Sequence, residues 1–266
     1  MNHCSYCDVA EKMITHSNYK LDVFQTTDTL YEAAAHFIVD RANKAIAERG
    51  RFVISLSGGQ TPKKLYALLA KPHFSTKMPW KKTFVFWGDE RCVPLDGERN
   101  NAHQAKKILL DKVDIPISNI HIIPVDLTPA EAAASYEKEL NAFFEGEPLR
   151  FDLILLGLGE NGHTASIFPG TKLVGDESIG IRDLYIEDEG ITVGPSYADG
   201  FRVTMTAPLI NEARNILFLV TGEGKTVVLN KVLNGPYLPD KYPAQLIKPV
   251  DGELIWFVDS KAGAEV

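Results

Sequence analysis

The chain has 266 residues, of which 45% are hydrophobic and 24% charged, so it can bury a core without disulfides or a structural metal. Its 28 basic and 35 acidic side chains leave a net charge of −7, which argues against nucleic-acid and membrane-surface partners. No apolar run reaches membrane-spanning length, and the N-terminus lacks a signal-peptide core. We therefore expect a cytoplasmic protein, with organellar targeting left open.

The N-terminal segment carries two of the three cysteines. Cys4 and Cys7 form a C-x2-C pair, which is half of a zinc site, but no second pair follows. A secreted disulfide framework is also excluded by so few cysteines. We expect residues 1–18 to be a poorly ordered extension, followed by a single α/β catalytic domain over residues 19–262.

Short apolar runs separated by amphipathic stretches dominate the rest of the chain. Near-continuous runs of this length are typical of strands buried on both faces of a parallel sheet. The predicted strands are 52–56, 83–87, 151–156, 216–220 and 254–258, with a shorter strand-like run at 202–206.

The intervening segments have readable helix boundaries. Residues 28–49 have helical spacing of apolar side chains and end before Gly50. Thr61 and Thr128 each precede a proline, which predicts a capping hydroxyl followed by a helix. Alternating strands and helices predict a Rossmann-like α/β fold, with a mostly parallel central sheet and helices on both faces. Residues 171–200 are rich in glycine and acid, and we expect an irregular or β excursion there, either a lid or a plain surface insertion.

The first predicted strand is followed by Ser57-Gly58-Gly59-Gln60-Thr61-Pro62. Ser57 and Thr61 offer hydroxyls, Gly58 and Gly59 allow close backbone approach, and the next helix points its N–H groups at the same place. This segment is either a phosphate cradle or an ordinary tight turn.

Three charged residues, Asp89, Glu90 and Arg91, follow the next predicted strand. Charges at the end of a buried strand are costly unless they are exposed or paired. They are therefore either a site carboxylate beside an arginine or a salt-bridged loop.

The central predicted strand is followed by Gly157, Gly159 and Gly162, which match G-x-G-x-x-G. The mid-chain position and the histidine directly after the third glycine argue against a dinucleotide fingerprint. His163 is the stronger feature, because glycines deliver it to a predicted strand–helix junction and imidazole can take a proton from water near neutral pH.

Two further cations follow or begin predicted strands. Arg202 opens the run at 202–206, and Lys225 lies in Gly224-Lys225-Thr226, where Leu219 replaces the glycine that a P-loop requires. Lys225 is either a phosphate contact or a solvated lysine. Since no metal-ligand set or cofactor motif is present, the residues predict a metal-free and cofactor-free enzyme that acts on a small phosphorylated metabolite by acid–base chemistry.

Segments 57–62, 88–94 and 157–169 together closely resemble the 6-phosphogluconolactonases, a branch of the glucosamine-6-phosphate isomerase/6-phosphogluconolactonase superfamily. The resemblance covers roughly residues 20–260. It implies a Rossmann-like sheet and hydrolysis of 6-phospho-D-glucono-1,5-lactone to 6-phospho-D-gluconate, the second step of the oxidative pentose phosphate pathway.

The resemblance also implies roles for individual residues. His163 would be the general base, and Arg91 or backbone N–H groups around Gly157, Gly159 and Gly162 would bind the developing oxyanion. The phosphate would be held by Ser57, Gly58, Gly59, Arg202 and Lys225. The partner is then a phosphorylated sugar lactone, without nucleic acid or membrane, and we expect a monomer or weak dimer.

Two comparisons within the superfamily bear on the reaction. The deaminase branch has a tyrosine at the position of Arg91 and a glutamate at the position of Phe168, so this chain follows the lactonase pattern. It departs from that pattern at Asn161, where the family usually has an aspartate. Either Asn161 suffices to orient His163, or Asp89 or Glu90 supports it. The rival functions are a sugar-phosphate isomerase or deaminase and a non-enzymatic sugar-phosphate sensor.

Overall fold

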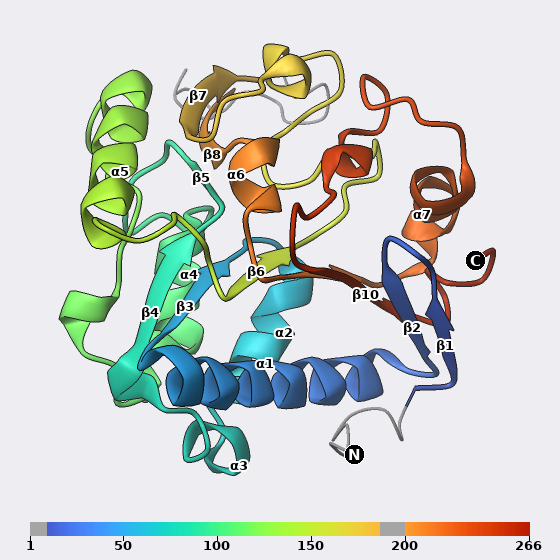
Figure 1. Ribbon diagram of the computed structural model, residues 1–266, viewed down its shortest axis with the longest axis horizontal. Helices are drawn as coiled ribbons and strands as arrows, with labels where there is room; N and C mark the ends of the chain where they lie inside the picture. Colours follow the sequence, from blue (N-terminus) through green and yellow to red (C-terminus); the bar gives the residue numbers. More distant parts are fainter. Residues whose placement is uncertain (1–9, 187–199) are drawn as a thin grey trace.

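The computed structural model describes residues 10–186 and 200–266, so the Cys4 and Cys7 pair lies outside the described residues. The described chain forms two sheets and the helices that cover them (Figure 1). No helix in these two ranges is long and apolar enough to cross a membrane.

The larger sheet has seven strands in the order β1-β2-β10-β9-β6-β3-β4. All neighbours pair in parallel except β1 and β2, which pair antiparallel at one edge. Its strands are β1 (Lys12–Thr15), β2 (Lys20–Phe24), β3 (Phe52–Leu56), β4 (Thr83–Trp87), β6 (Leu153–Leu156), β9 (Asn215–Val220) and β10 (Glu253–Asp259). Every residue of β3, β6 and β9 is buried, which explains why their sequences are apolar without alternation.

Helices cover both faces of this sheet, as expected. In Figure 1, α1 (Thr27–Arg49) and α2 (Gln60–Leu69) lie below the sheet, whereas α5 (Pro129–Phe143), α6 (Ala207–Asn211) and α7 (Thr226–Asn234) lie above it. This division follows from right-handed crossovers, because the chain moves along the sheet in one direction through α1 and α2 and returns in the other. The short helices α3 (Pro72–Ser75) and α4 (Asn101–Ile108) complete the set of labelled α-helices.

The second sheet is small and antiparallel, in the order β5-β8-β7. It consists of β5 (Asp89–Arg91), β8 (Phe201–Met205) and β7 (Ile181–Tyr185). The run at 202–206 is therefore a strand, as predicted. Residues 181–185 confirm the β part of the predicted irregular or β excursion, since β7 pairs with β8 along its whole length. Residues 187–199 of that segment lie outside the described residues.

Most predicted helix boundaries are confirmed, and one is wrong. Gly50 ends α1 with a φ of 77°, and Thr128 caps α5 in a capping box with Glu131. The predicted cap at Thr61 is wrong, because α2 begins at Gln60, two residues before the predicted start at Pro62, with Gly59 as its N-cap. The Thr61 hydroxyl instead lies 3.1 Å from the Thr221 hydroxyl, at the end of β9.

The expectation of a poorly ordered extension to residue 18 is wrong for residues 12–15. They form β1, whose four residues pair with β2 at the sheet edge. The alternation in these two strands is short and partly polar, which is why neither was predicted from apolar runs.

The topology places a crevice at the carboxyl ends of the strands of the larger sheet, between β6 and β3. β3 and β6 are neighbours, but β3 is followed by a helix on one face and the chain leaves β6 toward the other. Ligands of open α/β sheets bind at such a switch point, outside the carboxyl ends of the strands. Residues 57–62 and 157–163 follow these two strands directly.

Candidate active site

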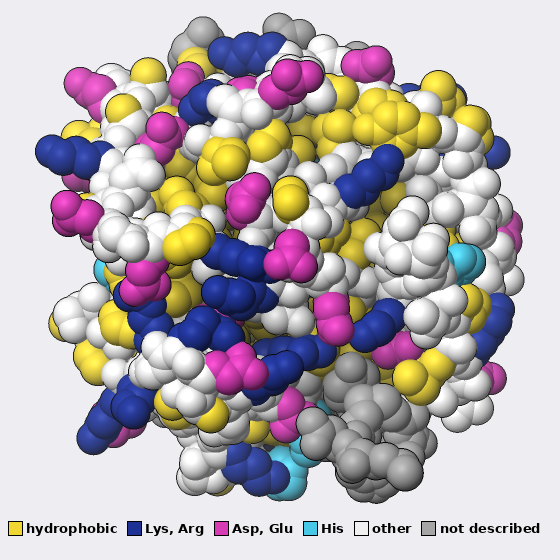
Figure 2. Space-filling model, viewed as in Figure 1, with side chains coloured by type: hydrophobic (Ala, Val, Ile, Leu, Met, Phe, Trp, Pro, Cys, Tyr) yellow, Lys and Arg dark blue, Asp and Glu magenta, His cyan; other side chains and the backbone are white. Residues whose placement is uncertain are grey.

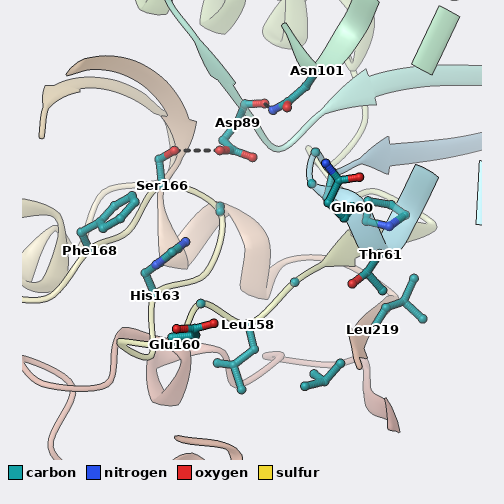
Figure 3. Close-up of a pocket in the computed structure, with 18 of the residues that line it drawn as sticks. Gln60, Thr61, Asp89, Asn101, Leu158, Glu160, His163, Ser166, Phe168 and Leu219 are labelled. Atoms are coloured by element: carbon teal, nitrogen blue, oxygen red, sulfur yellow. Dashed lines mark hydrogen bonds between the residues drawn. The ribbon is translucent and has the colours of Figure 1, made fainter. Parts of the chain in front are cut away.

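A cavity of about 620 Å³ opens at this switch point. The segments after β3, β6 and β9 and the facing strands β5 and β8 form its walls (Figure 3). Gly162 does not line it and packs against Tyr242 instead. The other predicted site residues all line the cavity: Ser57, Gly58, Gly59, Thr61, Asp89, Arg91, Gly157, Gly159, Asn161, His163, Arg202 and Lys225.

The cradle after β3 is fixed from both sides. The Tyr66 hydroxyl accepts a hydrogen bond from Ser57 N (3.1 Å) and donates one to Ser57 O (2.7 Å). Gly59 has a φ of 102°, a conformation that side chains rarely adopt. Gly58 lies against Asn101, since a Cβ at Gly58 would stand 1.9 Å from Asn101 Oδ1. With α2 beginning at Gln60, this loop has the open N–H groups that bind a phosphate.

Strand alternation decides which of the three charged residues in β5 reach the cavity. Asp89 and Arg91 line it, whereas Glu90, one residue between them, points the other way and is 1% exposed. The β5–β8 register pairs Arg91 with Arg202. Like charges directly opposite each other on a sheet destabilise it, so an anion bound between these arginines would stabilise the pair.

Glu90 has a structural role behind the site. Its carboxylate accepts hydrogen bonds from the backbone N–H groups of Arg91 (2.8 Å), Asn101 (2.8 Å) and Ala102 (2.9 Å), at the start of α4. Burial raises the pKa of Glu90 to about 7, and the three N–H donors oppose this rise. Glu90 thus binds backbone N–H groups at the start of α4, and His163 is not among its three described partners.

His163 is held by its own loop. Gly159 N donates to His163 O (2.8 Å), and a Cβ at Gly159 would lie 2.1 Å from the imidazole. Gly162 has a φ of 82° and packs against Tyr242, where a side chain would meet the backbone. Contrary to the prediction of a strand–helix junction, no α-helix follows β6 directly. Residues 157–171 form turns with an isolated bridge between Thr164 and Ile167.

Asn161 fixes the protonation pattern of the imidazole. Its Oδ1 lies 3.2 Å from His163 N and 2.6 Å from His163 Nδ1. The backbone N–H can only donate, so the side-chain atom facing it must be the amide oxygen. That oxygen only accepts, so in the neutral imidazole Nδ1 carries the hydrogen and Nε2 carries the lone pair of a base. Between the two ways of supporting His163, the geometry therefore favours Asn161.

Phe168 completes the setting of the histidine. Its ring stacks on the imidazole with the ring centroids 4.1 Å apart and an interplanar angle of 18°. The position where a deaminase is expected to carry a glutamate is thus occupied by an apolar ring that restrains His163.

The cavity has more cations than carboxylates in its wall. Arg91, Arg99, Arg202 and Lys225 line it, together with Asp89 and Glu160. Arg202 is 5% exposed, whereas Lys225 Nζ lies 3.8 Å from the largely exposed Glu160. Burial lowers the pKa of Lys225 and the nearby Glu160 raises it. The excess of cations over carboxylates in the cavity wall favours an anionic ligand.

Two of the glycines predicted to bind an oxyanion do not have free N–H groups. Gly159 N donates to His163 O, and Gly162 N donates to Gly159 O at 3.0 Å. They shape the loop instead. Arg91 is the better candidate, because only its Nη1 is engaged in the described hydrogen bonds, with Arg99 O and Asn101 Oδ1.

Sequence reasoning missed the roles of Arg99, Asn101 and Ser166. Asn101 Nδ2 donates to Asp89 O (3.1 Å), and Ser166 Oγ donates to Asp89 Oδ2 (2.7 Å). A signal was available for the first two, because Asn100 is a typical N-cap and places its neighbours at the start of a helix after a strand. No signal marked Ser166, whose partner is 77 positions away.

Within the described ranges, no cluster of three or more His, Cys, Asp or Glu side chains could hold a metal ion.

Comparison with known proteins identifies close relatives. Residues 25–256 match the family model described as glucosamine-6-phosphate isomerases/6-phosphogluconolactonase. The chain is similar to a 6-phosphogluconolactonase from Synechocystis sp., with 45% identity over 92% of this chain and 97% of the relative.

Solved structures show the same fold. A 6-phosphogluconolactonase from Trypanosoma brucei is 26% identical, with a TM-score of 0.80, over 95% of this chain and 100% of that one. A monomeric glucosamine-6-phosphate deaminase is 21% identical, with a TM-score of 0.77, over 92% of this chain and 98% of that one. The second likeness concerns the fold alone.

Proposed function

The chain belongs to the glucosamine-6-phosphate isomerase/6-phosphogluconolactonase family, and on that premise we propose that it hydrolyses 6-phospho-D-glucono-1,5-lactone to 6-phospho-D-gluconate in the oxidative pentose phosphate pathway. The observation that carries the proposal is the position of His163. Its base nitrogen is set by Asn161 in the cavity that also contains the glycine cradle and four cations.

His163 is the general base of the proposed reaction. Nε2 takes a proton from water as the water oxygen forms a bond to the lactone carbonyl carbon. When the tetrahedral intermediate collapses, the bond from that carbon to the ring oxygen breaks, and His163 returns the proton to the ring oxygen. A positioned base of this kind contributes about 10²–10⁴-fold to a rate. The lactone is already a reactive ester, so a base and an oriented substrate suffice without a metal.

The cations have two separate tasks in this scheme. Ser57, Gly58, Gly59, Arg202 and Lys225 hold the phosphate, with the N-terminus of α2 behind the cradle. Arg91 donates to the carbonyl oxygen as it gains negative charge. The phosphate keeps the reacting carbon beside His163, which is where binding energy lowers the barrier.

A coupled assay tests the reaction. Glucose-6-phosphate dehydrogenase generates the lactone, and 6-phosphogluconate dehydrogenase reports the product. We expect turnover far above spontaneous hydrolysis. Background rates would contradict the proposal, and ammonia release from glucosamine 6-phosphate would support the deaminase instead.

Phe168 argues against the deaminase, because its apolar ring occupies the place of an acid–base group. A bound sugar phosphate recovered unchanged would indicate a sensor. We also propose a monomer or weak dimer in the cytoplasm, and sedimentation equilibrium tests the assembly state.

A further inference from the structure

Asp89 and Ser166 form a pair in the cavity that the hydrolytic step leaves without a task. Ser166 Oγ donates to Asp89 Oδ2 at 2.7 Å, and Figure 3 draws this bond across the cavity wall. Ser166 itself is 1% exposed, and its N–H donates to the Thr204 hydroxyl at 3.2 Å. The pair therefore joins the histidine loop to two neighbouring strands of the small sheet.

Ser166 is held in a position that suits an anchor and not a nucleophile. A hydroxyl has one hydrogen to donate, and the hydrogen of Ser166 goes to a carboxylate and not to the imidazole. The preceding residue, Ala165, has a φ of 47°, the only positive value among the described non-glycine residues. Such a conformation is strained for a residue with a side chain and persists only where the surroundings impose it. The contacts of Ser166 supply that constraint.

Asp89 retains an unused acceptor in the cavity. Within the described residues, its carboxylate makes no ion pair shorter than 4.0 Å, and its hydrogen bond is the one from Ser166. An ionised carboxylate accepts hydrogen bonds and cannot donate them. Arg91, which lines the cavity from the same strand, only donates. A phosphate or carbonyl oxygen suits Arg91, whereas Asp89 requires a ligand group that carries a hydrogen.

The position of Asp89 indicates which part of a ligand it meets. Figure 3 places Asp89, Ser166 and His163 on one side of the cavity, with Gln60 and Thr61 of the phosphate cradle on the other. The ligand group beside Asp89 is therefore on the side of His163 and the reacting carbon, across the cavity from Gln60 and Thr61. In a sugar lactone, the nearest hydroxyl to the carbonyl carbon is the one on the adjacent carbon, C2.

We propose that Asp89, positioned by Ser166, accepts a hydrogen bond from the C2 hydroxyl of the lactone and so selects 2-hydroxylated substrates. This inference rests on the proposed lactonase function and names its specificity determinant. A site built to hydrogen-bond a hydroxyl discriminates strongly against the analogue that lacks it, because the buried partner is then left unpaired.

The experiment compares two lactones, 6-phospho-D-glucono-1,5-lactone and its 2-deoxy analogue, made by oxidation of the corresponding sugar phosphates. Each kcat/KM is divided by the spontaneous hydrolysis rate of the same lactone, since removing the hydroxyl also changes the reactivity of the carbonyl. We expect the wild type to prefer the hydroxylated lactone by roughly 30-fold or more. Asp89→Ala should reduce the preference to within about threefold, by lowering only the rate for the hydroxylated substrate.

Two variants separate positioning from general damage. Ser166→Ala should lower the preference for the hydroxylated lactone partially. It should raise KM for the hydroxylated lactone by a larger factor than it changes kcat for the 2-deoxy lactone. Glu160→Ala is the matched control, because Glu160 also lines the cavity but pairs with Lys225. It should change the two substrates alike.

Each outcome decides the inference. A wild type that hydrolyses both lactones equally, or an Asp89→Ala variant with an unchanged preference, overturns it even though the lactonase function stands. Calorimetric binding of 6-phosphogluconate and its 2-deoxy analogue needs no turnover. If no lactone is hydrolysed, the proposed function fails, and equal affinities in calorimetry would overturn the hydroxyl recognition separately.

Discussion

The two sheets differ in what they give the site. The larger one is apolar, and β3, β6 and β9 are buried throughout, so their carboxyl ends hold the cradle, the histidine loop and the lysine segment at fixed positions. The small sheet buries Val203 and Met205, whereas its cavity face is polar and carries Asp89, Arg91 and Arg202. The first sheet determines where a ligand binds, and the second determines which ligand groups are recognised.

Figure 2 shows Lys and Arg side chains gathered across the middle of one face, interleaved with acids. The second cavity with such lining lies at the amino ends of β6, β9 and β10, where Arg49 pairs with the buried Asp152 at 2.9 Å and Arg150 with Asp251 at 3.3 Å. These two ion pairs belong to a structural network at the end of the sheet opposite the active-site cavity.

The largest expected effect comes from the histidine loop of the larger sheet. His163→Ala should lower kcat by about 10²–10⁴-fold in the coupled assay, because no other base replaces Nε2. Its melting temperature should stay close to that of the wild type. His73→Ala, an exposed histidine on α3, is the control and should keep full activity. Near wild-type turnover by His163→Ala would remove the general-base role.

The next effect tests the cations of the two sheets against each other. Arg202→Ala should raise KM by roughly 10–100-fold, as expected for a lost charge-assisted hydrogen bond, and should do so more than Lys225→Ala, because Arg202 is more buried. Neither should affect an unphosphorylated gluconolactone. If both variants lose activity on that substrate equally, the phosphate assignment is wrong. Lys248→Ala, whose ammonium packs on Tyr237, controls for net charge.

Asn161→Asp probes the neutral amide beside the imidazole. A carboxylate at this position would stabilise the protonated ring, so the acid limb of the kcat/KM profile should move to higher pH by about one unit. Asn161→Ala should lower kcat without that displacement, since it removes the orientation and adds no charge. Superimposable pH profiles for wild type and Asn161→Asp would show that this contact does not tune the base.

The smallest effect concerns stability behind the small sheet. Burial raises the pKa of Glu90 to about 7, so between its unfolded pKa, about 4.3, and 7 the folded protein retains a proton that the unfolded chain has released. The free energy of unfolding should therefore fall as pH rises through this window. Melting temperatures between pH 5 and 8 measure it.

Glu90→Gln should flatten this dependence, and Glu145→Gln, at an exposed position, should leave it unchanged. A Glu90→Gln variant with the wild-type slope would place the titration elsewhere.

Five of the seven strands of the larger sheet could be predicted from sequence because their apolar patterns are local. Runs such as 52–56 and 216–220 are apolar at every position, and glycines with hydroxyls follow at once, so strand and cradle are legible together. The small sheet could not be predicted in this way. β5 reads as a charged loop, and it is a strand only because Arg202 and Val203, over 100 positions later, pair with it.

The same limit applied within the site. The sequence presented Asp89 and Glu90 as equivalent supports for His163, but alternation in β5 turns one into the cavity and the other beneath α4. Ser166 was invisible for a related reason, since its meaning depends on a long-range contact with Asp89. Nearest-neighbour patterns identify elements, whereas side-chain roles depend on which elements meet.

The contact between Gly58 and Asn101 restricts which substitutions this protein can accept during evolution. A methyl group at position 58 would collide with the Asn101 amide, which also holds Arg91 and the backbone of Asp89. A substitution on either side is therefore tolerated only if the other side changes with it. Positions 58 and 101 should vary together among descendants of this sequence, so that the phosphate cradle and the recognition strand are inherited as one unit.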